Sequence, residues 1–272
     1  MKASERCAIN TVCMPELHWT EALAACRTAG FRRVELLAVP GWVHIHPDTI
    51  TPEELTSEAH RIGVEIVGMH AGGINGESDT ALAETVGHIQ RVIELAAEIG
   101  AGRVVFSGMP SANETTPTQR EAVLDRIAEG LSCLALVASA HQVALCLENH
   151  YRCQVETLED YQHVFASPAL ETPWIGATVD TGHFTASGVD PAMVVMALGA
   201  RVRNVHIKDH RGEESVGLGY GDTDNAAVMR ALRAVGYDGD LTVELEVRDR
   251  DHALDYVREA YPYLSRLIAD GQ

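Results

Sequence analysis

The chain alternates eight times between a β-rich apolar run and an amphipathic helical stretch, and this alternation restricts its fold more than any other feature. The predicted strands are residues 8–12, 34–37, 64–70, 103–107, 143–148, 175–180, 202–208 and 241–246. The predicted helices are residues 16–29, 52–62, 80–99, 118–140, 158–166, 191–198, 225–235 and 251–268. Strands separated by helices in this way are typical of parallel sheets, because each helix returns the chain to the edge where the next strand begins.

Eight such units in 272 residues predict a closed (β/α)8 TIM barrel that occupies the whole chain, residues 1–272, as one domain. An open, doubly wound sheet is the alternative. That fold usually carries a glycine-rich phosphate loop after its first strand, and residues 10–15 (Asn-Thr-Val-Cys-Met-Pro) contain no glycine. We therefore expect the α/β barrel, with an active site at the C-terminal mouth of the strands.

The composition argues against several classes of function. The chain has 21 basic and 39 acidic residues, and its formal net charge of -18 would repel a phosphate backbone, so no nucleic-acid partner is expected. No apolar run approaches the roughly 20 residues of a membrane span, and no signal-peptide pattern is present, so no membrane association is expected. The six cysteines show no CxxC spacing, which favours reduced thiols and a cytoplasmic location.

Four predicted strands in the second half carry, at or near their C-terminal end, a side chain that can bind a metal: Glu148, Asp180, His206 and Glu244. Taken alone, Glu148 or Asp180 could instead cap the next helix or pair with a base, and His206 could be a core histidine with satisfied hydrogen bonds. In a barrel, however, the C-terminal ends of the strands meet at one mouth, so the four side chains should converge. Three carboxylates and one imidazole suit Mn²⁺, Mg²⁺ or Co²⁺, with Zn²⁺ as a further possibility.

Further polar side chains should face the same mouth. Strand alternation places His150, Lys208 and Glu246 two residues beyond three of these ligands and on the same face of their strands. A tight turn at the preceding glycine could bring His183 back over the mouth, and His70 ends the third predicted strand. The pocket should therefore combine carboxylates, imidazoles and one lysine.

Two assignments stay open at this point. Glu244 and Glu246 share one face of the last strand, so either could be the metal ligand, and the register after residues 236–239 favours Glu244. Lys208 could contact a substrate or pair with Glu246.

Five short segments follow one another, about one strand–helix unit apart. They are residues 147–150 (Leu-Glu-Asn-His), 179–183 (Val-Asp-Thr-Gly-His), 205–209 (Val-His-Ile-Lys-Asp), 217–222 (Gly-Leu-Gly-Tyr-Gly-Asp) and 236–244 (Gly-Tyr-Asp-Gly-Asp-Leu-Thr-Val-Glu). Together they resemble the xylose-isomerase-like barrel superfamily, and within it the sugar phosphate isomerase/epimerase family, which includes ketose 3-epimerases and inositol-catabolic enzymes. The resemblance covers the whole chain in layout, and its specific motifs lie in the second half.

The resemblance implies a divalent-metal-dependent sugar or polyol isomerase or epimerase in which Glu148, Asp180, His206 and Glu244 hold the metal. His183 would bind a substrate oxygen. Glu148 and Glu244 would be the catalytic residues, acting from opposite faces of the substrate. A metal that bridges a carbonyl and a neighbouring hydroxyl acidifies the C–H between them and stabilises the enediolate that forms.

The remaining expected substrate contacts are His70, His150, Lys208, Glu246 and Gln154. Gln154 marks a departure from the pattern of ketose 3-epimerases, which usually carry a substrate-binding glutamate six residues after the first ligand. This difference argues against epimerisation of a free ketose, but it does not affect the removal of a proton to form the enediolate.

Three other functions are weighed against the isomerase or epimerase. A lyase on the same scaffold, such as a dehydratase of a keto-inositol or of dehydroshikimate, would use His150, His183 or Lys208 as its general acid. An apurinic endonuclease would need an Asp-x-His pair that residues 209–222 lack. A barrel that only binds a sugar would usually have lost an acid, and here the set of four is complete. The expected partner is a small carbohydrate or cyclitol, with a homo-oligomer possible.

Overall fold

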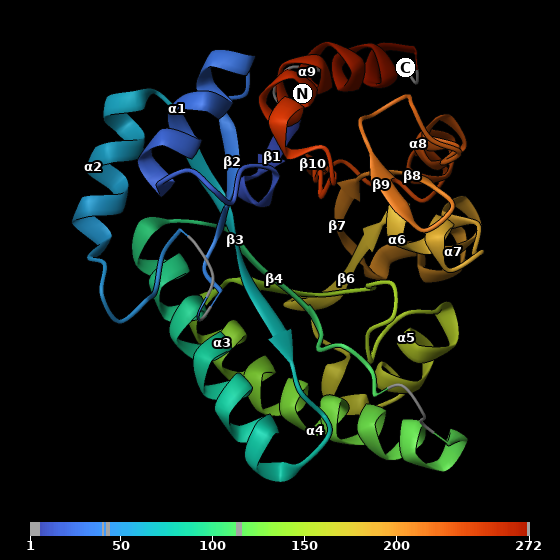
Figure 1. Cartoon of the computed structure of the whole chain (residues 1–272). Helices are drawn as coiled ribbons and strands as arrows, with labels where there is room; N and C mark the ends of the chain where they lie inside the picture. Colours follow the sequence, from blue (N-terminus) through green and yellow to red (C-terminus); the bar gives the residue numbers. More distant parts are fainter. Residues whose placement is uncertain (1–5, 40, 42–43, 113–115, 271–272) are drawn as a thin grey trace.

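The computed structural model describes residues 6–39, 41, 44–112 and 116–270. It confirms the predicted TIM barrel, because eight parallel strands close in the order β1-β10-β7-β6-β5-β4-β3-β2 (Figure 1). The barrel strands are β1 Cys7–Asn10, β2 Arg33–Leu37, β3 Glu65–Ile74, β4 Arg103–Gly108, β5 Ala144–Glu148, β6 Ile175–Asp180, β7 Val202–Ile207 and β10 Leu241–Val243.

Helices surround the strands, as Figure 1 shows. They are α1 Trp19–Ala29, α2 Pro52–Ile62, α3 Asp79–Ile99, α4 Pro117–His141, α5 Leu158–Val164, α6 Thr181–Ala186, α7 Pro191–Leu198, α8 Asn225–Ala234 and α9 Ala253–Asp270. Local chemistry fixes several of their ends. Thr51 and Thr116 form capping boxes at the starts of α2 and α4, each followed by a proline, and Gly63 and Gly100 end α2 and α3 in the left-handed conformation.

The structure corrects several predicted boundaries. The first strand ends at Asn10, not at residue 12, because the Asn10 side chain accepts a hydrogen bond from the Val12 N–H and starts a 3-10 helix, η2 Thr11–Cys13. The last strand ends at Val243, so Glu244 and Glu246 follow the strand. Gly182 lies inside the short helix α6 and does not form a tight turn.

The sequence analysis predicted neither the helix α6 nor the hairpin after β7. A small antiparallel hairpin, β8 Asp209–Arg211 and β9 Glu214–Val216, follows β7. It forms from residues directly after the His-Ile-Lys segment, where the sequence analysis predicted neither a strand nor a helix.

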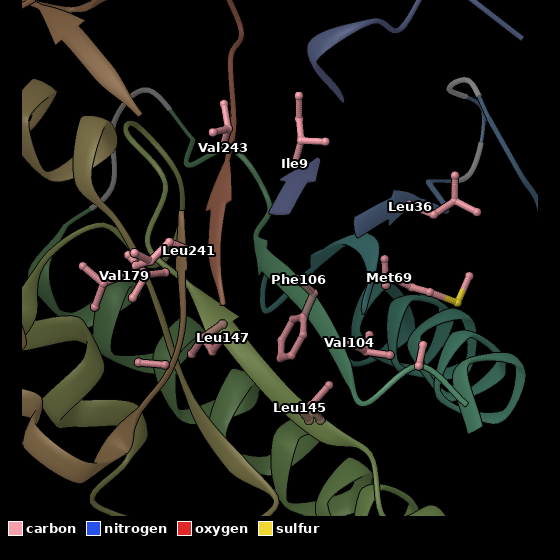
Figure 2. Close-up of a cluster of buried hydrophobic side chains, with 14 of the residues drawn as sticks. Ile9, Leu36, Met69, Val104, Phe106, Leu145, Leu147, Val179, Leu241 and Val243 are labelled. Carbon is pink, nitrogen blue, oxygen red and sulfur yellow. The ribbon is translucent and has the colours of Figure 1, made fainter. Parts of the chain in front are cut away.

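The apolar core lies between the strands and the helices. Residues that alternate along each strand point outward into this layer, among them Phe106 on β4, Leu147 on β5 and Val179 on β6, all of which are fully buried (Figure 2). Burial of these side chains on the outside of the sheet holds the helices against it, since each large apolar side chain removed from water contributes about 1.5–3 kcal/mol.

The inside of the barrel is polar. Arg103 on β4 donates to the Asp240 Oδ2 at 2.7 Å and to the Thr242 Oγ1 at 3.2 Å, and its Nε lies 3.4 Å from the Glu35 Oε2. Gly68 on β3 gives this guanidinium room, because a Cβ there would lie 2.8 Å from the Arg103 Cγ. Buried charges are stable when they are paired and hydrogen-bonded, and this interior satisfies that condition.

Among the described residues, no helix is both long enough and apolar enough to cross a lipid bilayer.

Replacing Phe106 with alanine tests the position of the core. The Phe106→Ala variant should lose about 3–5 kcal/mol of unfolding free energy, because the substitution leaves a cavity between β4 and the helices. The matched control is Leu136→Ala on α4, where the side chain is 76% exposed and the change should stay within about 0.5 kcal/mol. Urea unfolding followed by circular dichroism measures both, and equal midpoints for the two variants would contradict this packing.

Candidate functional site

The four predicted ligands lie together at the C-terminal mouth of the barrel. Glu148 and Asp180 are the last residues of β5 and β6, His206 is the penultimate residue of β7, and Glu244 directly follows β10. One potential ligand atom from each residue lies within 4.8 Å of the others, and none of the four residues is more than 5% exposed. We call these four residues the quartet.

Asp180 shows that the quartet suits a cation. Its Oδ1 accepts a hydrogen bond from the His183 N–H at 2.7 Å, whereas its buried Oδ2 accepts no hydrogen bond from the described residues and lies 3.4 Å from the Lys208 Nζ. The Asn149 side chain fixes the Asp180 backbone through bonds of 2.8 and 3.2 Å. A buried carboxylate oxygen without a hydrogen bond is costly, and a metal ion would satisfy it. The oxygen-rich donor set fits a divalent ion.

His206 is held in one orientation by a residue that the sequence analysis missed. Its Nε2 lies 2.8 Å from the Oε1 of Glu35, a fully buried carboxylate on β2. Its Nδ1 faces Glu148 in a very short contact and lies 3.4 Å from the Glu244 Oε2. Because Nε2–H donates to Glu35, Nδ1 is the ring nitrogen that faces the carboxylates of the other quartet residues. The only signal for Glu35 was a single carboxylate between Val34 and Leu36 in a predicted strand.

The quartet is strongly coupled electrostatically. Burial raises the pKa of Asp180 well above its usual value, and Glu244 and Glu148 add to that effect against the attraction of Lys208. Burial would also raise the pKa of Glu244, but the positive charges of Lys208 and His206 hold it well below its usual value. Burial opposes protonation of His206, yet the carboxylates of Glu244, Glu148 and Glu35 raise its pKa well above the usual value. The buried acids of the quartet therefore depend on nearby positive charge, and a divalent cation would add to it.

A second group lies beside the quartet. Potential ligand atoms of His150, His183 and Glu246 also lie within 4.8 Å of one another, and the rings of the two histidines are 3.8 Å apart between centroids. The structure thus places Glu244 in the quartet and Glu246 in this second group. The fully buried Lys208 donates to the Glu246 Oε2 at 2.6 Å and to the Glu244 Oε2 at 2.9 Å.

His70 contacts the quartet from β3. Its Nδ1 accepts from the Gly72 N–H at 3.2 Å, so its Nε2–H can donate to the Glu148 Oε2 at 3.1 Å. His70, Glu148, Glu244, His150 and Glu246 line one cavity of about 190 Å³. Apolar side chains complete the wall, namely Val12, Leu37, Val39 and Met109. Carboxylate, imidazole and apolar side chains therefore line this cavity together.

Gln154 lies apart from this cavity. Its Oε1 accepts from the Gly76 N–H at 2.9 Å, and its Nε2 donates to the Asn75 Oδ1 at 3.2 Å. It lines a separate hollow of about 450 Å³ that includes Arg120 and Arg126. In this conformation the amide links the segment after β5 to the segment after β3.

Asp209 is a second residue that the sequence analysis did not single out. Its Oδ2 accepts from the N–H groups of Gly219 and Gly221 at 2.9 and 3.0 Å, and its Oδ1 accepts from the Thr223 N–H at 3.1 Å. The glycine-rich segment 217–222 is therefore folded onto the residue that directly follows Lys208.

The fold and the site together define a TIM barrel with a buried carboxylate–histidine centre for a metal. The sequence matches the xylose isomerase-like TIM barrel family over residues 23–267, and the chain belongs to that family.

Curated relatives are similar over part of their length. The inosose dehydratase of Mesomycoplasma hyopneumoniae (strain 7448) is 26% identical over 166 residues, which covers 53% of this chain and 55% of the relative. The ketose 3-epimerase of Arthrobacter globiformis is 27% identical over 164 residues, covering 57% of this chain and 53% of the relative. The chain thus spans about half the length of these relatives.

A solved structure agrees over nearly the whole fold. The IOLI protein with a binding zinc atom superposes with a TM-score of 0.82, covering 98% of this chain and 99% of that protein, at 17% sequence identity. At this identity the likeness establishes the fold.

Substitution of Glu35 tests the support of His206. Glu35→Gln should weaken Mn²⁺ binding by about 10–100-fold, because residues that orient a metal-binding histidine usually contribute that much. Asp160→Asn is the matched control: Asp160 is also a buried carboxylate, paired with Arg120 away from the quartet, so its loss should leave the affinity unchanged. Isothermal titration measures both, and equal affinities for Glu35→Gln and the wild type would contradict the assigned role.

Proposed function

We propose that the chain is a divalent-metal-dependent isomerase or epimerase of a small sugar or polyol. The observation that carries the proposal is that Glu148 and Glu244 belong to one metal-binding quartet and line one cavity. Membership of the xylose isomerase-like family supports it, as does the similarity to a ketose 3-epimerase.

Glu148, Asp180, His206 and Glu244 would hold the metal. When bound, a divalent ion polarises a carbonyl and an adjacent hydroxyl of the substrate, which lowers the pKa of the C–H between them. Mn²⁺, Mg²⁺ or Co²⁺ suits the three carboxylates and one imidazole, and Zn²⁺ is a further candidate because a protein of the same fold binds it.

The two glutamates would move the protons. One carboxylate accepts the proton from the carbon beside the carbonyl, and the electron pair of the broken C–H bond passes to the carbonyl oxygen to give an enediolate. The other glutamate returns a proton to the opposite face of the same carbon, which is epimerisation. Alternatively, it returns the proton to the neighbouring carbon while the hydroxyl proton passes to the former carbonyl oxygen, which is isomerisation. The His70 Nε2 contacts the Glu148 Oε2 at 3.1 Å, and the Lys208 Nζ donates to the Glu244 Oε2 at 2.9 Å. These bonds hold each carboxylate in one orientation.

The proposed substrate is a carbohydrate or cyclitol without a phosphate group. No arginine from the described part of the chain lines the cavity of the quartet. The ammonium group of the nearby Lys208 is already paired with Glu244 and Glu246. A phosphate would meet acids there without a free cation to bind it.

A metal-dependent dehydratase is the second candidate. The similarity to inosose dehydratases favours it, and so do two possible proton donors beside the quartet, His150 and Lys208. The same enediolate would then lose a β-hydroxyl as water, with the donor supplying the proton. Gln154 bonds to Asn75 and Gly76 and does not line the cavity, which is also compatible with this chemistry.

Deuterium exchange separates these candidates. The Mn²⁺-loaded protein should incorporate deuterium at a carbon of a ketose or an inosose in D₂O, as followed by NMR. Retention of the carbon skeleton and all hydroxyls identifies isomerisation or epimerisation, whereas loss of water and an absorbing enone identifies dehydration. Absence of exchange across a panel of ketoses, inososes and keto acids would refute the proposal.

Replacement of either glutamate should stop the reaction. Glu148→Gln and Glu244→Gln should each lower kcat by at least about 10²–10⁴-fold, since an amide cannot accept the proton. Glu16→Gln is the control, because Glu16 lies on the surface and pairs with Arg250. Steady-state kinetics and circular dichroism measure activity and folding, and two active, folded glutamine variants would contradict the assigned chemistry.

A further inference from the structure

The ammonium group of Lys208 lies between the quartet and the second group. Its Nζ is 2.9 Å from the Glu244 Oε2 and 3.4 Å from the Asp180 Oδ2, both of which belong to the quartet. It is also 2.6 Å from the Glu246 Oε2 and 2.9 Å from the His183 Nε2, which belong to the second group. Three carboxylates and one imidazole thus surround this nitrogen, as they would surround a metal ion.

The type of side chain at this position is unusual for the chain. Only two of its 21 basic residues are lysines, Lys2 and Lys208, and all the others are arginines. Lys2 lies outside the described residues. A lysine provides a compact point charge with three donors, whereas the planar guanidinium of arginine is larger and binds carboxylates side by side. The position therefore holds the basic side chain that most closely resembles a small cation.

The backbone around Lys208 leaves its side chain little freedom. The Lys208 N–H donates to the Thr181 Oγ1 at 3.0 Å, and that hydroxyl donates to the Lys208 carbonyl oxygen at 2.8 Å. Gly182 lies directly against the side chain, since a Cβ there would lie 2.7 Å from the Lys208 Cγ. The first turn of α6 thus packs against the lysine, and the side chain with its ammonium group is fully buried.

We propose that Lys208 is a built-in second cation of this pocket. The protein then takes one divalent ion, in the quartet, because the ammonium occupies the place that a second ion would take among His150, His183 and Glu246. This inference rests on the proposed metal centre.

Charge supports a single metal ion. The carboxylates around the two groups are Glu148, Asp180, Glu244 and Glu246. One divalent ion and one ammonium leave a single net negative charge among these four acids, whereas a second divalent ion beside Lys208 would make the pocket positive. Two like charges within contact distance in a buried site repel strongly, so the ammonium and a second metal exclude one another. The His183 Nε2 and the Glu246 Oε2 are also already used as acceptors by Lys208.

Removal of the ammonium should open the second position. Mn²⁺ is titrated into the wild type and into Lys208→Met, which preserves the length and apolar stem of the side chain. Calorimetry and metal analysis after gel filtration should give one ion per chain for the wild type and two for Lys208→Met. The double variant Lys208→Met/Glu246→Gln should bind one ion again, because it lacks a ligand of the second group.

The outcomes distinguish this inference from the proposed function. Two ions in the wild type, or one ion in Lys208→Met, would overturn the role of Lys208 and leave the quartet intact. No ion in the wild type would refute the metal centre itself.

A measurement on the wild type covers the case in which Lys208→Met does not fold. Electron paramagnetic resonance of the wild type with excess Mn²⁺ should show protein-bound manganese without manganese–manganese coupling, and a coupled spectrum would overturn the inference.

Thermal unfolding adds a further readout for a folded variant. Excess Mn²⁺ should raise the Tm of Lys208→Met more than that of the wild type, since two binding sites then stabilise the folded state, and an equal or smaller rise would contradict it.

Discussion

The carboxylate of Glu35 is the interaction on which the interior of this barrel depends. It lies fully buried on β2, where an unpaired charge would be very unfavourable. Three other strands, β1, β4 and β7, supply its partners, because Asn10, Arg103, Asn204 and His206 all direct polar hydrogens at its two oxygens. Burial alone would raise its pKa, yet the neighbouring His206 and Arg103 lower it. The carboxylate therefore stays ionised and ties opposite sides of the barrel together.

The same carboxylate connects the stability of the barrel to the chemistry at its mouth. Asn10 donates both to the Glu35 Oε1 at 2.9 Å and to the Glu244 Oε1 at 3.1 Å, so one amide links the interior to a quartet member. Glu35 also orients His206. Two of the four quartet side chains are thus positioned from below by buried hydrogen bonds, and not by flexible loops. A site held in this way can keep its geometry while a substrate exchanges.

The sequence predicted those features that repeat or that lie at strand ends. Alternation of apolar runs and helices predicted the barrel, and the position of Glu148, Asp180 and His206 at the ends of their strands predicted their convergence. Glu35 was not found, because one acid inside a short strand looks the same whether it faces solvent or a buried partner on another strand. Asp209 was not found either, because its bonds to Gly219 and Gly221 join residues that no local pattern relates.

The quartet by itself does not determine which reaction follows proton removal. Isomerisation, epimerisation and dehydration all begin with the same deprotonation beside a polarised carbonyl, so they place equal demands on these four residues. They differ in where the next proton is delivered, and that depends on the groups around the quartet. In this chain those groups are His150, His183 and Glu246, arranged around the fixed ammonium of Lys208. Burial and the charge of Lys208 lower the pKa of His183 to about 3, so His183 serves as a neutral hydrogen-bonding group while the ammonium carries the positive charge. The specificity of the reaction should therefore depend on this second group more than on the identity of the metal.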